Sequence, residues 1–181
     1  VLTFQKGIEA FLRERFPAMD ISFVSLADLW NGKERSQLNQ MALAKQAYAS
    51  KARLLHHVLR QTETPVFYCD LDILFIQSAK DLLDEFGTHS LLLFPHWNDS
   101  LRALHRYGLF NAGLIGARRG ADSFLEWWSE RCLEDGVRDL ADSFYDDQGY
   151  LDLVPLYFDP AIYRGQKHNL GPWCLRSVEP P

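Results

Sequence analysis

The sequence lacks a long apolar stretch. None of its hydrophobic runs approaches the roughly 20 residues that a membrane-spanning helix needs. Charged side chains at Lys6, Glu9 and Arg13 interrupt the first residues too early for a signal peptide. We therefore expect no transmembrane segment and a cytoplasmic location, with attachment to a membrane surface through a segment outside this sequence left open.

Basic runs and cysteines are also scarce. The formal net charge is -5, and no stretch rich in Lys and Arg could follow a phosphate backbone, so nucleic acid is not expected as a partner. The three cysteines, Cys69, Cys132 and Cys174, are widely spaced and odd in number. This usage argues against a disulfide framework and a zinc cluster, and it fits a reducing cytosol.

The length of 181 residues predicts a single domain over residues 1–181, although a chain that begins with Val is also consistent with a fragment of a longer one. Hydrophobic periodicity predicts strands at 21–26, 66–69, 73–76, 90–94, 109–117, 156–158 and 162–163. Helices are expected at 8–16, 37–60, 78–87 and 121–133, and from 146 or 147 to 155. The polar segments 27–36 and 95–108 are expected as loops.

This alternation of strands and helices predicts an α/β fold with a mostly parallel sheet. In such a sheet, ligands gather at the carboxyl ends of the strands. We therefore expect a ligand-binding site at the end of the strand that precedes Asp70.

Two carboxylates follow an apolar strand in the stretch Phe67-Tyr68-Cys69-Asp70-Leu71-Asp72. Carboxylates at such a strand end are costly unless something compensates them. A divalent cation is a natural partner, because hard cations prefer oxygen ligands. The alternative is a turn in which both side chains cap backbone amides, and for an isolated Asp-x-Asp it is favoured about two to one.

Three later segments carry further polar groups. Asn111-Ala112-Gly113 puts an amide and a glycine inside an apolar strand, which indicates a bulge or the close approach of a ligand or backbone. Asp146-Asp147-Gln148 precedes a helix, where capping explains one carboxylate more readily than two. The segment from His168 to Trp173 contains an imidazole, which is usually structural but is also a common metal ligand.

In this order, the four segments resemble those of GT-A glycosyltransferases, especially the retaining, galactosyltransferase-like members and related nucleotide-diphospho-sugar transferases. The resemblance spans roughly residues 51–173 and implies a Rossmann-like sheet flanked by helices. That family begins with a strand and loop that hold the nucleotide base. Here only a helix is expected before the strand at 21–26, so the first strand is expected to be missing.

The resemblance implies a metal and diphosphate site at the Asp-x-Asp motif, formed by Asp70, Leu71 and Asp72. His168 matches the late His that supplies the third protein ligand to Mn²⁺ or Mg²⁺. Lys51 lies on the helix before this strand, where related enzymes often place a basic residue against the nucleotide.

The donor sugar has its own matching residues. Asn111, Ala112 and Gly113 match the strand that lines this sugar in the family. Asp147 and Gln148 match the acidic-Gln pair near the anomeric carbon, so they are the candidate catalytic residues. Asp146 competes with Asp147 for the acidic role.

The implied activity is metal-dependent transfer of a sugar from a nucleotide-diphosphate donor to a hydroxyl acceptor such as a glycan. The metal would stabilise the charge on the leaving diphosphate as a Lewis acid. The segment Pro95–Gly108 is expected to bind the acceptor, because it offers flat rings and hydrogen-bond donors.

Two alternatives stand beside this reading. A Mg²⁺-dependent phosphatase of the haloacid-dehalogenase type would use Asp70 as a nucleophile and Asp72 as an acid and base. A degenerate transferase fold would bind a glycan or a protein without catalysis.

Overall fold

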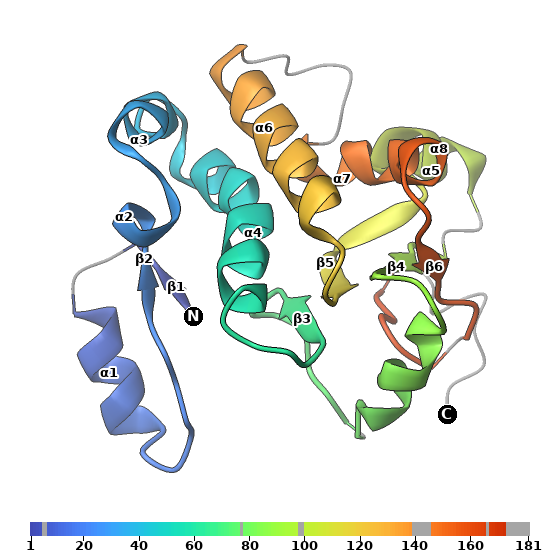
Figure 1. Ribbon diagram of the computed structural model, residues 1–181, viewed down its shortest axis with the longest axis horizontal. Helices are drawn as coiled ribbons and strands as arrows, with labels where there is room; N and C mark the ends of the chain where they lie inside the picture. Colours follow the sequence, from blue (N-terminus) through green and yellow to red (C-terminus); the bar gives the residue numbers. More distant parts are fainter. Residues whose placement is uncertain (5–6, 77, 98–99, 139–145, 166, 173–181) are drawn as a thin grey trace.

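The computed structural model describes residues 1–4, 7–76, 78–97, 100–138, 146–165 and 167–172, without the side chains of 135–138 and 146. The chain is an α/β protein (Figure 1). Its strands are β1 (Leu2–Thr3), β2 (Val24–Ser25), β3 (Val66–Cys69), β4 (Leu91–Pro95), β5 (Phe110–Ala117) and β6 (Ala161–Ile162). Its helices are α1 (Ile8–Arg15), α2 (Leu26–Leu29), α3 (Gly32–Leu38), α4 (Leu43–Leu59), α5 (Leu101–Tyr107), α6 (Asp122–Arg138), α7 (Asp146–Gly149) and α8 (Val154–Tyr157), with 3-10 helices η1 (Lys80–Phe86) and η2 (Tyr150–Leu153).

The main sheet is mixed, so the expectation of a mostly parallel sheet is wrong. Its order is β3-β5-β4-β6; β5 runs antiparallel to β3 and β4, and β4 pairs with β6 in parallel. A parallel return needs a crossover that covers a face of the sheet. The described part of the connection from β4 to β5 contains the seven-residue α5, which buries none of its residues, so no crossover helix covers the sheet there and β5 returns in the opposite direction.

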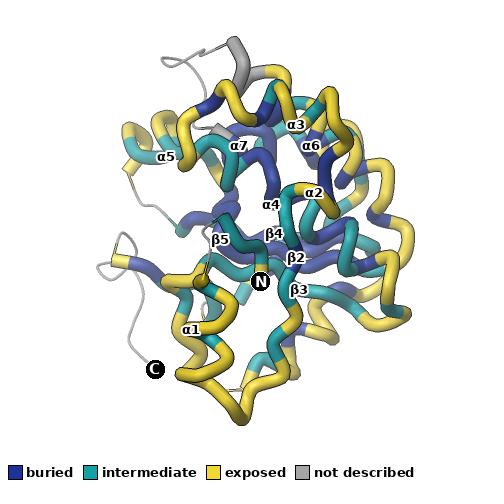
Figure 2. The backbone as a smooth tube through the Cα atoms, turned by 90° about the vertical axis from the view of Figure 1, so that its left-hand side faces the viewer, coloured by how far each residue is buried: buried dark blue, intermediate teal, exposed yellow. Residues whose placement is uncertain are grey.

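The sheet separates two hydrophobic clusters, because alternate side chains of a strand point to opposite faces. Leu91 and Leu93 pack with α4 and α6, whereas Leu92 and Phe94 pack with η1 and Tyr163. Buried backbone runs through α4, α6, β4 and β5 at the centre of the molecule (Figure 2). The strand ends are therefore supported from both sides.

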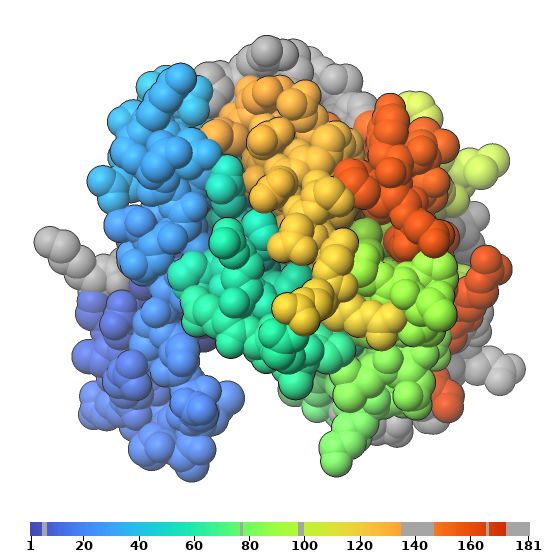
Figure 3. All heavy atoms as spheres, in the orientation of Figure 1, coloured from blue at the N-terminus to red at the C-terminus, as the bar shows by residue number. Residues whose placement is uncertain are grey.

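The N-terminal residues form a lobe beside α4, at the left of Figure 3. Strand β1 pairs with β2 in parallel, and α1 between them buries none of its residues. The helix 8–16 is confirmed, but the expectation that only a helix precedes the strand near residue 21 is wrong, because β1 comes first.

The segment 27–36 is helical where a loop was expected. Ser25 and Asp28 form a capping box that opens α2. Asn31 accepts hydrogen bonds from the backbone N–H groups of Lys33 and Glu34, and Glu34 completes a second capping box that opens α3. A capping box satisfies backbone donors at a helix start, so Asn31-Gly32 begins a helix here rather than making a turn.

Other segments also differ from expectation. The segment 95–108, expected as a loop, contains the helix α5, which Ser100 caps by accepting from the Ala103 N–H. The predicted helix 37–60 is divided, since α3 ends at Leu38 and α4 begins at Leu43. Residues 73–76 form no strand, and 156–158 fall largely in α8, whose first turn contains Pro155. Proline is tolerated there because a first-turn N–H has no helical partner to lose. Across the described ranges, no helix is both long and apolar enough to cross a bilayer.

Candidate functional site

Asp70 lies at the carboxyl end of β3, beside the beginning of β5. Because these strands are antiparallel, Cys69 pairs with Leu114, and the Asp70 N–H donates to the Gly113 carbonyl at 2.8 Å. The Tyr68 hydroxyl donates to Asp70 Oδ1 at 2.6 Å. The direction of β5 thus brings Asn111, Ala112 and Gly113 to the Asp-x-Asp motif.

Lys51 reaches this point from α4 and joins two carboxylates. Its Nζ lies 3.3 Å from Asp70 Oδ2 and 3.1 Å from Asp147 Oδ2, and it donates to the Ala112 carbonyl at 3.4 Å. We call Lys51, Asp70 and Asp147 the Lys51 cluster. The side chains of Lys51 and Asp147 are 7% and 5% exposed, whereas that of Asp70 is 35% exposed, so a ligand can reach the cluster through Asp70.

The two carboxylates of the Lys51 cluster keep the Lys51 ammonium charged. Burial opposes the ammonium of Lys51, but the carboxylates of Asp147 and Asp70 outweigh burial and hold the pKa of Lys51 above its usual 10.5. Burial and Asp70 raise the pKa of Tyr68 well above its usual range, so its hydroxyl stays protonated and donates. Two carboxylates against one ammonium leave one negative charge in surplus.

Gly113 is required by the crowding around Asp70. A Cβ at this position would lie 2.7 Å from Asn111 Oδ1 and 3.1 Å from Asp70 Oδ2. Asn111 Oδ1 also accepts the Gly113 N–H at 2.6 Å. The sequence predicted a bulge or the close approach of a ligand or backbone at this glycine, but the groups that approach it are the side chains of two candidate site residues.

Gln148 is buried and fully engaged with backbone. Its Oε1 accepts from the Ala112 N–H at 2.9 Å, and its Nε2 donates to the Tyr107 carbonyl at 2.6 Å. The Trp128 indole N–H donates to the Asp147 carbonyl at 2.8 Å and fixes α7 against α6. Gln148 therefore holds α7, β5 and the end of α5 together, and its amide faces protein groups. The side chain of Asp146 lies outside the described residues.

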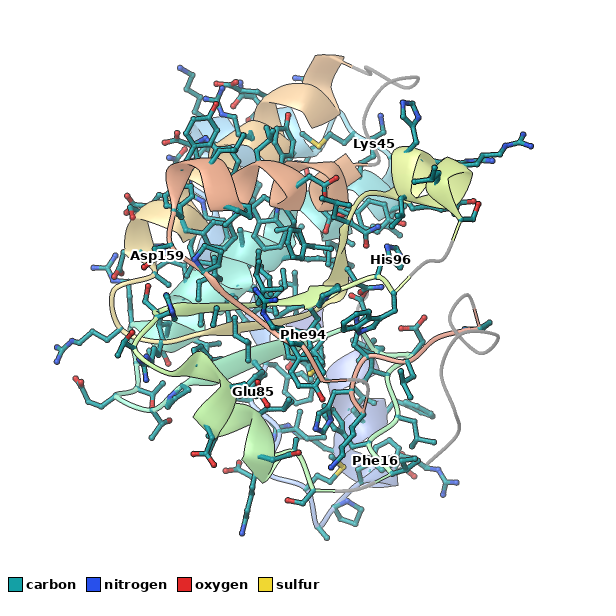
Figure 4. The ribbon with its side chains drawn as sticks, turned by 90° about the vertical axis from the view of Figure 1, so that its right-hand side faces the viewer. Phe16, Lys45, Glu85, Phe94, His96 and Asp159 are labelled. Atoms are coloured by element: carbon teal, nitrogen blue, oxygen red, sulfur yellow. The ribbon has the colours of Figure 1, made fainter. Side chains whose placement is uncertain are left out.

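His96 borders the site from the end of β4, at the right of Figure 4. Its Nδ1 lies 3.5 Å from Gln148 Nε2, and its backbone N–H donates to the Leu109 carbonyl at 2.8 Å. Burial lowers the pKa of His96 below its usual 6.5, against a hydrogen bond with the backbone of Gly108. The ring is therefore neutral at pH 7.

The predicted metal ligands are not gathered. Ile73 donates its N–H to the Asp70 carbonyl at 3.1 Å, so Leu71 and Asp72 form the tip of a turn, where both are exposed. His168 Nε2 lies 3.0 Å from Asp81 Oδ2 on η1. Within the described ranges, no group of three His, Cys, Asp or Glu residues could hold a metal ion. As arranged, Asp70, Asp72 and His168 do not fit a three-ligand site.

Two backbone conformations near the end of β4 are unusual. Among the described residues other than glycine, Trp97 and Asn169 have positive φ, at 50° and 59°. The Asn169 side chain donates to the Pro95 carbonyl at 3.5 Å, so both lie beside the same strand end. For a bulky residue such as Trp97 this conformation costs about 1–3 kcal/mol, whereas asparagine adopts it readily. Trp173 of the late motif lies outside the described residues.

Tyr68 and Trp128 contact candidate site residues, and the sequence motifs did not identify them. The sequence could have indicated Tyr68, because residues two apart in a strand point to the same face, and Tyr68 lies two residues before Asp70. No sequence pattern could have indicated Trp128, since its hydrogen-bond partner is a backbone carbonyl.

Comparison with known proteins adds one partial match. The uncharacterized protein YfnF of Bacillus subtilis (strain 168) is 32% identical over 104 residues, which cover 51% of this chain and 34% of that protein. The chain thus spans about a third of the length of this relative. No family model and no solved structure matches the chain.

Proposed function

We propose that the chain is a GT-A-type glycosyltransferase that moves a sugar from a nucleotide-diphosphate donor to a hydroxyl acceptor. The observation that carries this proposal is the convergence of three separated motif segments and α4. Lys51, Asp70, Asn111–Gly113 and Asp147 meet at one edge of the sheet. Helix capping or a local turn would not require these distant segments to meet.

Asp70 would bind the donor. Its carboxylate is the exposed member of the Lys51 cluster, and it offers charged acceptors to sugar or ribose hydroxyls. Lys51 would hold Asp70 in place, since it contacts both carboxylates from a buried position. Asp147 would lie near the anomeric carbon and orient the sugar. Holding the two substrates in line can lower such a barrier by about 7–11 kcal/mol.

The role of Mn²⁺ or Mg²⁺ stays a prediction of the resemblance. The surplus negative charge of the Lys51 cluster suits a cation, but Lys51 Nζ already lies between the two carboxylates. Asp72 and His168 would have to approach Asp70 before a three-ligand site could form.

The test is calorimetric titration of UDP, GDP, ADP and CDP with and without Mn²⁺. We expect one nucleotide to bind the wild type, and Asp70→Asn to weaken that binding at least about tenfold, because hydrogen bonds to a charged partner are strong. Asp84→Asn is the matched control, because Asp84 is an exposed carboxylate on η1, and it should bind as the wild type does. Failure of all four nucleotides to bind folded protein contradicts the proposal.

A further inference from the structure

Three oxygen atoms surround the ammonium of Lys51. Asp147 Oδ2 lies 3.1 Å from Nζ, Asp70 Oδ2 lies 3.3 Å away, and the Ala112 carbonyl oxygen lies 3.4 Å away. An ammonium has three N–H donors, so these acceptors match its donors in number. Carboxylate and carbonyl oxygens are also the ligands that hard divalent cations prefer. Lys51 thus occupies an oxygen-lined position that would otherwise suit a metal ion.

Two aromatic rings also lie near this ammonium. Nζ is 5.3 Å from the centre of the Tyr48 ring and 5.4 Å from that of the Tyr68 ring. A ring face attracts an ammonium within about 6 Å, and the attraction grows when water is excluded. The Lys51 side chain is 7% exposed, so water has little access to it. These surroundings combine oxygen acceptors with ring faces, which suits an ammonium better than a divalent ion that prefers oxygen ligands alone.

Two of the three predicted metal ligands have other partners. Asp70 Oδ1 accepts from the Tyr68 hydroxyl at 2.6 Å, so both oxygens of Asp70 are engaged. His168 Nε2 lies 3.0 Å from Asp81 Oδ2. Of the three predicted ligands, only Asp72 is exposed and has no hydrogen bond or ion pair with the described residues. One carboxylate is few for a divalent ion, because such ions take about six or more oxygen ligands.

We propose that Lys51 is the built-in cation of this site. Its ammonium occupies the position between Asp70 and Asp147 that a divalent ion would need, so the chain without nucleotide binds Mn²⁺ or Mg²⁺ only weakly. The inference rests on the proposed function and assigns the charge that holds the two carboxylates of its site together. Because Lys51 is part of α4, these carboxylates stay together whether or not a donor is bound. Lys51 is thus a positioning residue for both of them.

Electron paramagnetic resonance of Mn²⁺ tests the inference, because the signal of the hydrated ion falls as the ion binds to protein. The titrations contain no nucleotide, so their result does not depend on a donor. We expect the wild type to bind Mn²⁺ with a dissociation constant above about 1 mM. Lys51→Met should bind it at least about tenfold more tightly, because the change frees two carboxylates and a carbonyl for the ion.

Two further variants control for charge and for position. Lys33→Met removes an exposed lysine from α3, and with it the same formal charge, so it should bind Mn²⁺ as weakly as the wild type does. Lys51→Met/Asp147→Asn neutralises one of the freed carboxylates and should lose most of the gain in affinity. Mn²⁺ should also raise the melting temperature of Lys51→Met and leave that of the wild type unchanged, because a ligand stabilises the folded state that binds it.

Three results would overturn the inference. The first is that the wild type binds Mn²⁺ more tightly than about 1 mM without nucleotide and that Asp72→Asn or His168→Gln abolishes this binding. The second is that folded Lys51→Met binds Mn²⁺ no more tightly than the wild type. The third is that Lys51→Met is unfolded and Mn²⁺ does not restore its folding. If the Mn²⁺ results are as expected but no nucleotide binds, the proposed function fails while the role of Lys51 stands.

Discussion

The two carboxylates of the Asp-x-Asp motif lie in opposite surroundings. Asp70 receives hydrogen bonds from Tyr68 and Lys51, and its backbone is bound to β5. Asp72, two residues later, is exposed at the tip of a turn. Two carboxylates of one motif can therefore have different roles. Asp70 is part of the hydrogen-bonded structure of the site, whereas Asp72 is exposed and is available to a ligand. The predictions for Lys51 and Asp72 test this division directly, and those for Gln148 and His96 test the buried surroundings of the site.

The largest effect is expected from Lys51→Met. Removing the ammonium leaves Asp147, which is 5% exposed, without its compensating charge. Breaking one partner of a buried ion pair costs about 3–5 kcal/mol. Urea denaturation should show this loss in the free energy of unfolding. The double variant Lys51→Met/Asp147→Asn should recover much of it, and a double variant as unstable as the sum of both single changes would refute the pairing.

Gln148→Ala should be the next most damaging change. It leaves the Ala112 N–H and the Tyr107 carbonyl without partners, and each unsatisfied buried group costs about 1–3 kcal/mol. The control is Gln61→Ala, at an exposed glutamine, which should change stability by less than about 0.5 kcal/mol. Equal denaturation midpoints for the two variants would show that Gln148 does not hold β5 in place.

A smaller effect should appear as a pH dependence due to His96. Its pKa in the folded protein is below the usual 6.5, so the unfolded chain binds a proton first as the pH falls. Its contribution to stability is therefore complete above about pH 6.5 and is lost as the pH falls toward the folded pKa. Melting temperatures from pH 7.5 to 5 should fall less steeply for His96→Asn than for the wild type. Parallel curves would mean that His96 is not buried as a neutral ring.

The smallest effect on stability is expected from Asp72→Asn. An exposed turn residue should change the free energy of unfolding by no more than about 0.5 kcal/mol. If Asp72 serves a ligand, Mn²⁺-dependent nucleotide binding should nevertheless weaken at least about tenfold in calorimetry. A loss of stability like that of Lys51→Met would show that the two carboxylates are not divided in this way.

Hydrophobic periodicity predicted the elements that carry the core. Strands at 66–69, 90–94 and 109–117 and the helix at 121–133 correspond to β3, β4, β5 and α6. The helix at 8–16 corresponds to α1, which buries none of its residues. The direction of β5 could not be predicted in this way, because an alternating pattern reads the same in both directions. The direction of a strand depends on how the connection before it packs. Here that connection contains α5, and its exposure depends on the tertiary structure rather than on a local sequence pattern.

The part of the candidate site that consists of contacts between side chains could be predicted from the sequence. The family resemblance selected Lys51, Asp70 and Asp147, and the structure brings these three side chains together. Gln148 was predicted to be a catalytic residue, but its hydrogen-bond partners are the backbone groups of Ala112 and Tyr107. Contacts to backbone groups leave no pattern in the sequence from which they could be predicted. His168 was selected as a metal ligand, yet it pairs with Asp81, a contact that depends on how η1 packs.

The course of β5 has a consequence for folding. The Lys51 cluster and its backbone partner draw on residues 51, 70, 112 and 147, so no short segment of the chain contains them. Closing such long loops costs chain entropy before any contact offsets it. A partly folded chain with α4 already helical would therefore carry Lys51 as a solvated cation and both aspartates as separate anions. The cluster would form only when α4, β3, β5 and α7 have come together, so its ion pairs contribute nothing to the stability of any one of these segments alone.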